Sequence, residues 1–166
     1  MNCEQEHPSF RRGGERPERV ALFAGSFDPF TVGHESIVRR ALPLFDRIVI
    51  AIGVNPAKRA MLEPETRRRF IEHAFAGEPR VSVITYSGLT ADAARSVGAT
   101  FLLRGVRMVQ DFESEMAMAE VNRRLSGLET VLLYTLPSMS HISSSVVREL
   151  QSHGCDVSEY LPHGGE

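Results

Sequence analysis

Five short apolar runs alternate with longer stretches of helical spacing along this chain, and this alternation limits the possible folds more than any other feature. The runs are rich in Val, Ile and Leu and are continuous, which is typical of strands buried on both faces of a parallel sheet. Parallel strands need long connections, and helices supply them. The predicted strands cover residues 19–24, 47–53, 80–86, 100–105 and 130–135, and the predicted helices cover residues 34–45, 64–76, 89–97, 111–126 and 143–153.

Prolines and glycines indicate where the predicted helices begin and end. Pro64 suits a first helical turn, and Gly98, Gly127 and Gly154 follow helical stretches at positions where glycine commonly ends a helix. Pro43 lies inside the first predicted helix, where it cannot donate a backbone hydrogen bond. We therefore expect that helix to be kinked or shortened.

Right-handed crossovers leave few ways to arrange five parallel strands. We predict an α/β fold with a doubly wound, five-stranded parallel sheet, Rossmann-like, in the strand order 3-2-1-4-5. In this order the first and fourth strands are neighbours where the winding reverses, and ligands of such sheets bind beyond the carboxyl ends of the strands at that point. The loops over residues 24–34 and 104–111 should therefore face one ligand.

Length and composition limit the class of protein. The 166 residues are enough for one domain, which we place at residues 19–166, after a disordered N-terminal tail over residues 1–18 that has no periodicity. No apolar run approaches the ~20 residues of a membrane span, so we expect no membrane association. The formal charge of -2 gives no overall attraction for nucleic acid. Two distant cysteines without metal spacing suggest free thiols in a reducing cytoplasm.

The loop after the first strand, AGSFDPFTVGH, leads directly into a helix. Gly25 and Gly33 allow the backbone to approach a ligand closely, and the start of the helix offers unpaired N–H groups. His34 at that helix start could donate a hydrogen bond to a phosphate oxygen, with the Ser26 hydroxyl beside it. The alternative is a turn in which His34 only caps the helix.

Three further segments carry groups that suit phosphate. Arg104 and Arg107 follow the fourth strand, where they could bind phosphate oxygens or, alternatively, form solvated surface ion pairs. The last helix opens on serines at 143–145, which combine hydroxyls with helix-end N–H groups, although a plain N-cap needs only one of them. Lys58 follows the second strand on the same edge of the sheet; taken alone, it is an ordinary solvated lysine.

Together these groups predict a polyphosphate site and therefore nucleotide chemistry. The sequence contains no Gly-x-x-x-x-Gly-Lys-Ser/Thr motif, which argues against a P-loop enzyme, and the first loop lacks the G-x-G-x-x-G spacing of dinucleotide-binding Rossmann proteins. A nucleotide-dependent enzyme is the main hypothesis. A non-catalytic nucleotide-sensing module of the same fold is the hypothesis from another class.

At these residues the chain resembles the bacterial phosphopantetheine adenylyltransferase family, part of the HIGH-motif nucleotidyltransferase superfamily. The resemblance covers residues 19–162 and rests on five motifs in chain order, GSFDPFTVGH, NPAK, LLRGVR, DFESEMAMAEVNRRL and ISSSVVREL, followed by DVSEYLP. It implies transfer of the adenylyl group of ATP to 4'-phosphopantetheine, giving dephospho-coenzyme A and pyrophosphate, the penultimate step of coenzyme A biosynthesis. It also implies Mg²⁺ carried by the ATP phosphates without protein ligands, a cytoplasmic homohexamer and feedback binding of coenzyme A.

The resemblance also assigns roles to residues. The implied catalytic residues are His34, Lys58 and Arg104, with His34 on the phosphates at the reacting centre. The implied phosphopantetheine site comprises Ser26, Lys58, Thr90 and Arg104. The implied ATP site comprises Ser26, Phe27, His34, Gly105, Val106, Arg107, Glu115, Met139, Ser140, His141, Ile142, Ser143, Ser144 and Ser145.

Some positions depart from the family pattern. Thr90 stands where relatives often have an apolar residue, so its contact could be through the backbone, and Met139 and His141 stand where aromatic residues are common. Relatives that use nicotinamide mononucleotide or transfer a cytidylyl group usually have a second histidine where this chain has Thr31, which argues against both activities. The apolar residues of MAMAEV, 116–121, could serve the core or a subunit interface, and we expect the core for most of them.

Overall fold

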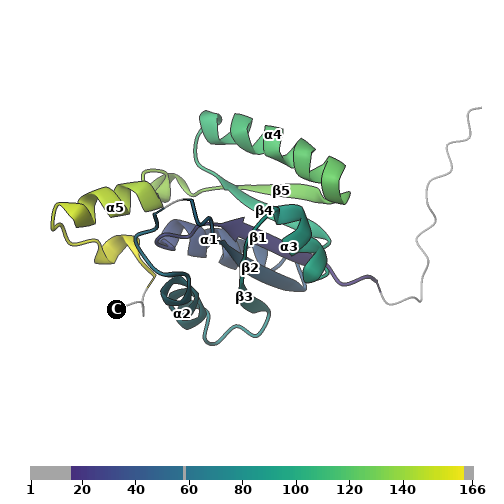
Figure 1. Cartoon of the computed structure of the whole chain (residues 1–166), viewed down its shortest axis with the longest axis horizontal. Helices are drawn as coiled ribbons and strands as arrows, with labels where there is room; N and C mark the ends of the chain where they lie inside the picture. The colour runs from purple at the N-terminus through teal and green to yellow at the C-terminus, as the bar shows by residue number, and fades with distance from the viewer. Residues whose placement is uncertain (1–15, 58, 163–166) are drawn as a thin grey trace, which may run out of the picture.

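The computed structural model describes residues 16–57 and 59–162. Within them, five strands form one parallel sheet in the order β3-β2-β1-β4-β5, which confirms the predicted sheet and its strand order. Each crossover contains a helix, as Figure 1 shows. The strands are β1 (Val20–Gly25), β2 (Arg47–Gly53), β3 (Val81–Tyr86), β4 (Phe101–Val106) and β5 (Glu129–Tyr134).

The helices lie close to the ranges that the sequence predicts. The first begins two residues earlier than predicted, because Thr31 caps it, and its last residue is Ala41, so Pro43 shortens the helix instead of kinking it. The helices are α1 (Val32–Ala41), α2 (Pro64–Ala74), α3 (Thr90–Ser96), α4 (Val109–Ser126) and α5 (Ser144–Ser152), with short 3-10 turns at Pro137–Met139 and Ser158–Tyr160. None of the helices that the structure describes is both long and apolar enough to cross a membrane.

Helices pack on both faces of the sheet. On one face, Ile37 of α1 and Ile71 of α2 pack against strand residues that include Phe23 and Ile50. On the other face, alanines of α3 pack in a smaller cluster that includes Leu102. Apart from their end residues, β1 and β2 are buried, as their continuous apolar runs predict. Each large side chain buried in this way contributes about 1.5–3 kcal/mol to stability.

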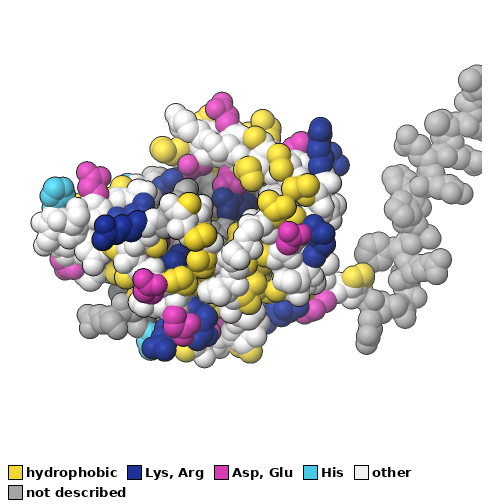
Figure 2. All heavy atoms as spheres, in the orientation of Figure 1, with side chains coloured by type: hydrophobic (Ala, Val, Ile, Leu, Met, Phe, Trp, Pro, Cys, Tyr) yellow, Lys and Arg dark blue, Asp and Glu magenta, His cyan; other side chains and the backbone are white. Residues whose placement is uncertain are grey.

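Helix α4 lies along β5 at one edge of the sheet and has no buried residue (Figure 1). Met116, Met118 and Val121 are 57%, 52% and 48% exposed, so the expectation that most of the apolar residues of 116–121 lie in the core is wrong for the single chain. The physical reason is that α4 lies at the rim of the sheet, where its main contacts among the described elements are with β4, β5 and α3. Hydrophobic side chains gather over α4 in Figure 2.

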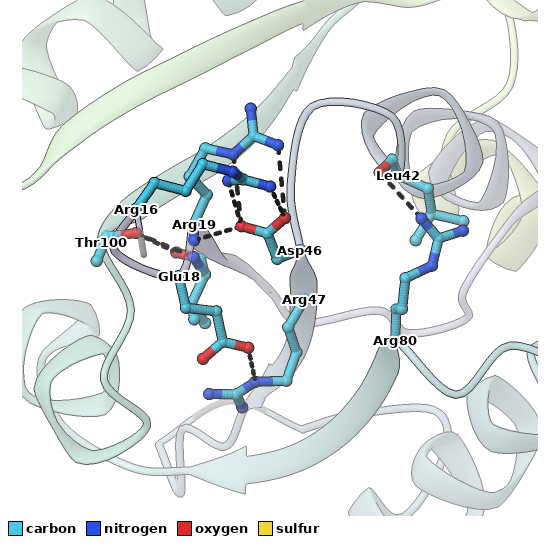
Figure 3. Close-up of polar contacts among 9 residues, drawn as sticks. Arg16, Glu18, Arg19, Leu42, Asp46, Arg47, Arg80 and Thr100 are labelled. Atoms are coloured by element: carbon cyan, nitrogen blue, oxygen red, sulfur yellow. Dashed lines mark hydrogen bonds and ion pairs between the residues drawn. The ribbon is translucent and has the colours of Figure 1, made fainter. Parts of the chain in front are cut away.

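Ion pairs hold the chain at the amino ends of the strands, opposite the predicted site. Arg16 donates hydrogen bonds of 2.8 and 2.6 Å to the carboxylate of Asp46, and the backbone N–H of Arg19 donates another of 2.8 Å (Figure 3). Glu18 pairs with Arg47 beside them. The hydrogen bonds from Arg16 and Arg19 hold the pKa of Asp46 well below its usual range. Residues 16–18 therefore contact the domain, and residues 1–15 of the predicted tail lie outside the described residues.

Candidate active site

A cavity of about 340 Å³ lies beyond the carboxyl ends of β1 and β4, where the sequence places the ligand. Its walls come from the loop between β1 and α1, the end of β4, one face of α4 and the start of α5. The cavity therefore brings together residues as far apart in the chain as Phe23 and Arg148. The predicted site residues that line it are Ser26, Phe27, His34, Arg104, Gly105, Arg107, Glu115, Ile142, Ser143, Ser144 and Ser145.

Among the residues that the structure describes, five predicted ones do not line this cavity. Thr90 lines an adjoining cavity of about 110 Å³, whose wall also includes Arg104 and Glu115. Lys58 lies outside the described residues. Val106 is buried in the fold, and its side chain is 3% exposed. The structure places Met139, Ser140 and His141 in the turn before α5, where the ring of His141 lies 6.3 Å from that of Tyr160, so their contact with ATP stays a prediction. 

His34 occupies the third position of α1 and forms a capping box with Thr31. The backbone N–H of Thr31 donates to His34 Nδ1 at 3.0 Å, and the backbone N–H of His34 donates to the Thr31 hydroxyl at 3.4 Å. His34 therefore takes part in capping the helix, and the cap uses only one ring nitrogen. Because Nδ1 accepts, the neutral ring carries its proton on Nε2, which is left as a hydrogen-bond donor at the cavity.

The surroundings of His34 keep its ring neutral. Burial, together with the positive charges of Arg107 and Arg104, lowers the pKa of His34 from 6.5 to about 4, and burial is the largest cause. The rings of Phe27 and Phe30 pack against the imidazole, with centroids 5.2 and 5.3 Å away. At neutral pH His34 therefore offers a neutral N–H donor here, and no imidazolium charge.

The loop between β1 and α1 is held in a strained conformation. Phe27 has a φ of 46°, in the left-handed region that residues with a side chain rarely adopt, and its ring is buried among Phe23, Phe30 and His34. Its side chain therefore belongs mainly to the core. A Cβ at Gly25 would lie 2.9 Å from that ring, so glycine is needed here to let the loop turn over the cavity.

Two of the arginines that line the cavity are paired with carboxylates. Arg104 donates to Glu115 through Nε at 2.7 Å and through Nη2 at 2.5 Å, while its Nη1 donates to the carbonyl oxygen of Ala24. Arg107 donates to Asp111 at 3.0 Å. Asp111 opens the motif DFESEMAMAEVNRRL but is not among the predicted site residues. These are the ion pairs that the sequence left as the alternative, but they lie in a cavity at the switch point and not on an open surface.

Arg148 is a third arginine on the cavity wall, and the sequence reasoning missed it. It donates to the carbonyl oxygen of Asp28 at 2.6 Å and to the Ser145 hydroxyl at 3.0 Å. Among the ion pairs of the described residues, it has no carboxylate partner. Its position inside ISSSVVREL, four residues after Ser144 and so on the same helix face, was the signal that could have found it.

The three serines at the start of α5 do different things. Ser143 caps the helix by accepting from the backbone N–H of Val146 at 3.2 Å. The Ser144 hydroxyl donates to the carbonyl oxygen of Pro29 at 2.8 Å, which fastens the helix to the first loop. Ser145 accepts from Arg148 within α5. Ser143 thus acts as the cap, and Ser144 connects the start of α5 to the first loop. 

Comparisons with known proteins place the chain in a family. A cytidylyltransferase-like family model matches residues 22–150. The phosphopantetheine adenylyltransferase of Porphyromonas gingivalis is 54% identical over 147 residues, which cover 89% of this chain and 96% of that protein. The enzyme of the same name from Flavobacterium johnsoniae is 56% identical over 144 residues, covering 87% and 95%.

Solved structures agree on the fold. A Vibrio parahaemolyticus protein described as a nicotinate-nucleotide adenylyltransferase has a TM-score of 0.66 at 16% identity, covering 90% of each chain. The bifunctional NMN adenylyltransferase/ADP ribose pyrophosphatase from Francisella tularensis has a TM-score of 0.69 at 16% identity, covering 89% of this chain and 46% of that one. At this identity they support only the fold. The identity to the curated relatives is far higher, and on it the chain belongs to the phosphopantetheine adenylyltransferase family.

Proposed function

We propose that this protein transfers the adenylyl group of ATP to 4'-phosphopantetheine, giving dephospho-coenzyme A and pyrophosphate. The observation that carries the proposal is the arrangement of two adjoining cavities that share Arg104 and Glu115. The larger one has the helix starts, hydroxyls and arginines that suit a triphosphate. The smaller one has a mixed lining of apolar and uncharged polar residues that suits an uncharged arm ending at Arg104.

The reaction needs positioning more than covalent chemistry. An oxygen of the acceptor phosphate attacks the α-phosphorus of ATP, the bond from that phosphorus to the bridging oxygen breaks, and pyrophosphate leaves. A phosphate oxygen is already ionised near neutral pH, so no strong base is required. The protein has to hold the two reactants in line and stabilise the charge that develops on the α-phosphate.

His34 fits the task of stabilising the charge that develops on the α-phosphate. Its Nε2–H would donate to an α-phosphate oxygen, and the unpaired N–H groups at the start of α1 would act beside it. A neutral ring with one fixed donor suits this role, because its direction is set by the bond from Thr31 to Nδ1. The rest of the triphosphate would meet Arg107, Arg148 and the serines at the start of α5.

Arg104 fits the task of holding the two reactants in line, because it lines both cavities. Both reactants are anions, and a cation between them offsets their repulsion. Lys58 would bind the phosphate group of 4'-phosphopantetheine, a role that rests on the resemblance. Thr90 lines the smaller cavity, where its hydroxyl lies 3.0 Å from that of Tyr86, so it would contact the arm of the acceptor.

Mg²⁺ would enter on the phosphates of ATP and neutralise part of their charge. We assign it no protein ligands, since the two carboxylates on the cavity wall, Asp111 and Glu115, are both engaged with arginines.

We further propose that the enzyme is a cytoplasmic homohexamer that binds coenzyme A as a feedback inhibitor. The exposed apolar residues of α4 support an assembly, because an apolar surface of this kind commonly marks a protein interface.

The test is a reaction of the purified protein with ATP, Mg²⁺ and 4'-phosphopantetheine. Pyrophosphate should form only when both substrates are present, and dephospho-coenzyme A should be found by mass. Nicotinamide mononucleotide is the matched alternative acceptor, and equal pyrophosphate release with it would reject the proposal. Binding of ATP in a calorimetric titration without any turnover would favour the nucleotide-sensing module.

A further inference from the structure

Two segments at the site hold each other by hydrogen bonds that run in both directions. The carboxylate of Asp28 accepts from the backbone N–H groups of Met61 at 2.7 Å and Leu62 at 2.9 Å. In return, the Arg67 guanidinium donates through Nη1 to the carbonyl oxygen of Ser26 at 2.6 Å. Residues 26–28 and residues 61–67 thus form a reciprocal clasp.

Both charged members of the clasp are buried, Asp28 being 7% and Arg67 3% exposed. A buried charge is costly unless it is hydrogen-bonded, so each needs a reason to be there. Each oxygen of Asp28 accepts one N–H, which commits both of them to the partner segment. Arg67 differs from its neighbours on α2, because Arg68 and Arg69 pair with Glu65 at the surface.

Arg67 keeps its charge in the interior without a carboxylate partner among the described ion pairs. Within the described part of the chain its Nε is buried without a hydrogen-bond partner, and the one hydrogen bond from its guanidinium goes to the first loop. A helix that only needed an apolar contact at this position would be better served by leucine or isoleucine. The presence of a buried guanidinium at position 67 is therefore explained by its hydrogen bond to the first loop.

The clasp joins two parts of the site that serve different substrates under the proposed function. Residues 26–28 include the strained Phe27 and lead to His34, on the nucleotide side. Asp28 is also held from α5, since Arg148 donates to its carbonyl oxygen. On the other side of the clasp, Met61 follows three residues after Lys58, which the resemblance assigns to the acceptor phosphate.

We propose that Asp28 and Arg67 are positioning residues that couple the nucleotide loop, residues 26–28, to the acceptor-side segment, residues 61–67, so that binding on one side orders the other. Such coupling is reciprocal, because each ligand must change the affinity for the other by the same factor. This inference rests on the proposed function for the identity of the two ligands. The hydrogen bonds of the clasp do not depend on that identity.

Asp28→Asn and Arg67→Lys test the proposal with small changes of shape. Asparagine presents an NH₂ group to one of the two backbone donors, and lysine cannot reproduce the direction of the guanidinium. Calorimetry would measure the affinity for 4'-phosphopantetheine with and without α,β-methylene ATP, which cannot release pyrophosphate. The ratio of the two affinities should fall about fivefold or more in each variant, a typical size for coupling between sites.

Matched controls are Asp92→Asn and Arg69→Lys, which make the same chemical changes at exposed ion pairs on α3 and α2. The controls should keep the wild-type ratio. An unchanged ratio in both clasp variants, with only a lower melting temperature, would show that the clasp merely stabilises the fold and would overturn the proposal.

Amide hydrogen exchange gives a readout in the wild-type protein, independent of whether the variants fold. α,β-Methylene ATP alone should slow exchange at the N–H groups of Met61 and Leu62, and this effect should be lost in Asp28→Asn. No slowing at these two amides in the wild-type protein would overturn the coupling even if the enzyme is active. If instead the wild-type protein makes no dephospho-coenzyme A but the slowing occurs, the proposed function fails and the clasp stands.

Discussion

Replacing His34 with alanine should reduce both stability and turnover, and the two losses have separate sources in the structure. The stability loss comes from the capping box, since the backbone N–H of Thr31 would lose its acceptor at Nδ1. Loss of a cap costs about 1 kcal/mol. For a domain of this size that is a fall in melting temperature of roughly 2–4 °C.

The loss in turnover should be larger, because it concerns the other ring nitrogen. Removing one preorganised donor from a centre where negative charge develops typically lowers turnover by ~10²–10³, or about 3–4 kcal/mol. We expect His34→Ala to remain folded and to bind 4'-phosphopantetheine as before. A coupled pyrophosphate assay and thermal unfolding by circular dichroism measure the two losses, with His73→Ala, an exposed histidine of α2, as the control. Normal turnover with a lower melting temperature would show that His34 is only a cap.

The same ring predicts how stability depends on pH. His34 has a pKa of about 4 in the folded chain, chiefly through burial, against about 6.5 in the unfolded chain. Below pH 6.5 the unfolded chain takes up the proton first, so His34 lowers stability as the pH falls towards 4, by about 3 kcal/mol in all. Above pH 6.5 it should have no effect. An NMR titration of the ligand-free protein in which His34 titrates near 6.5, or carries its proton on Nδ1, would refute this reasoning.

Two further predictions concern the acceptor site and assembly. Replacing Lys58 or Arg104 with alanine should weaken 4'-phosphopantetheine more than ATP in calorimetric titrations, because both cations are assigned to the acceptor phosphate; the reverse preference would reject that assignment. Met116→Glu should shift the protein to smaller species in light scattering, because it places a charge on the exposed apolar face of α4. A monomeric wild-type protein at micromolar concentration would rule out the homohexamer.

The sheet could be predicted from the sequence because its central strands are buried on both faces. A short, continuous apolar run such as the one in Arg47–Gly53 indicates a strand that is covered on both faces. The preference for right-handed crossovers then limits the order in which such strands can be arranged. Helix α4 could not be read in the same way. A run of apolar residues such as 116–121 shows that something must cover it, but not whether the cover is the chain's own sheet or another molecule.

Some residues of the candidate site could be predicted from the sequence, and others could not. His34, Arg104 and Ser143 could be predicted because they stand in loops or helix starts that the topology brings to one edge. Asp28 and Arg67 could not, because each acts on the backbone of a segment 33 to 41 residues away. Every residue has a backbone carbonyl group and every residue except proline has a backbone N–H, so no pattern in the sequence marks which of them a buried side chain will reach.

The pairing of Arg104 with Glu115 changes how the arginine motif should be understood. A motif indicates that a cation is present, whereas the structure shows that its Nε and Nη2 edge is already taken by a carboxylate and that Nη1 reaches Ala24. A guanidinium has five N–H donors, so these bonds leave two for a phosphate and fix their direction. Glu115 therefore lowers the net charge that attracts the acceptor and, in exchange, holds Arg104 in one orientation before the acceptor arrives. Since the reaction depends on positioning two anions, a fixed direction at moderate charge serves it better than a free cation would.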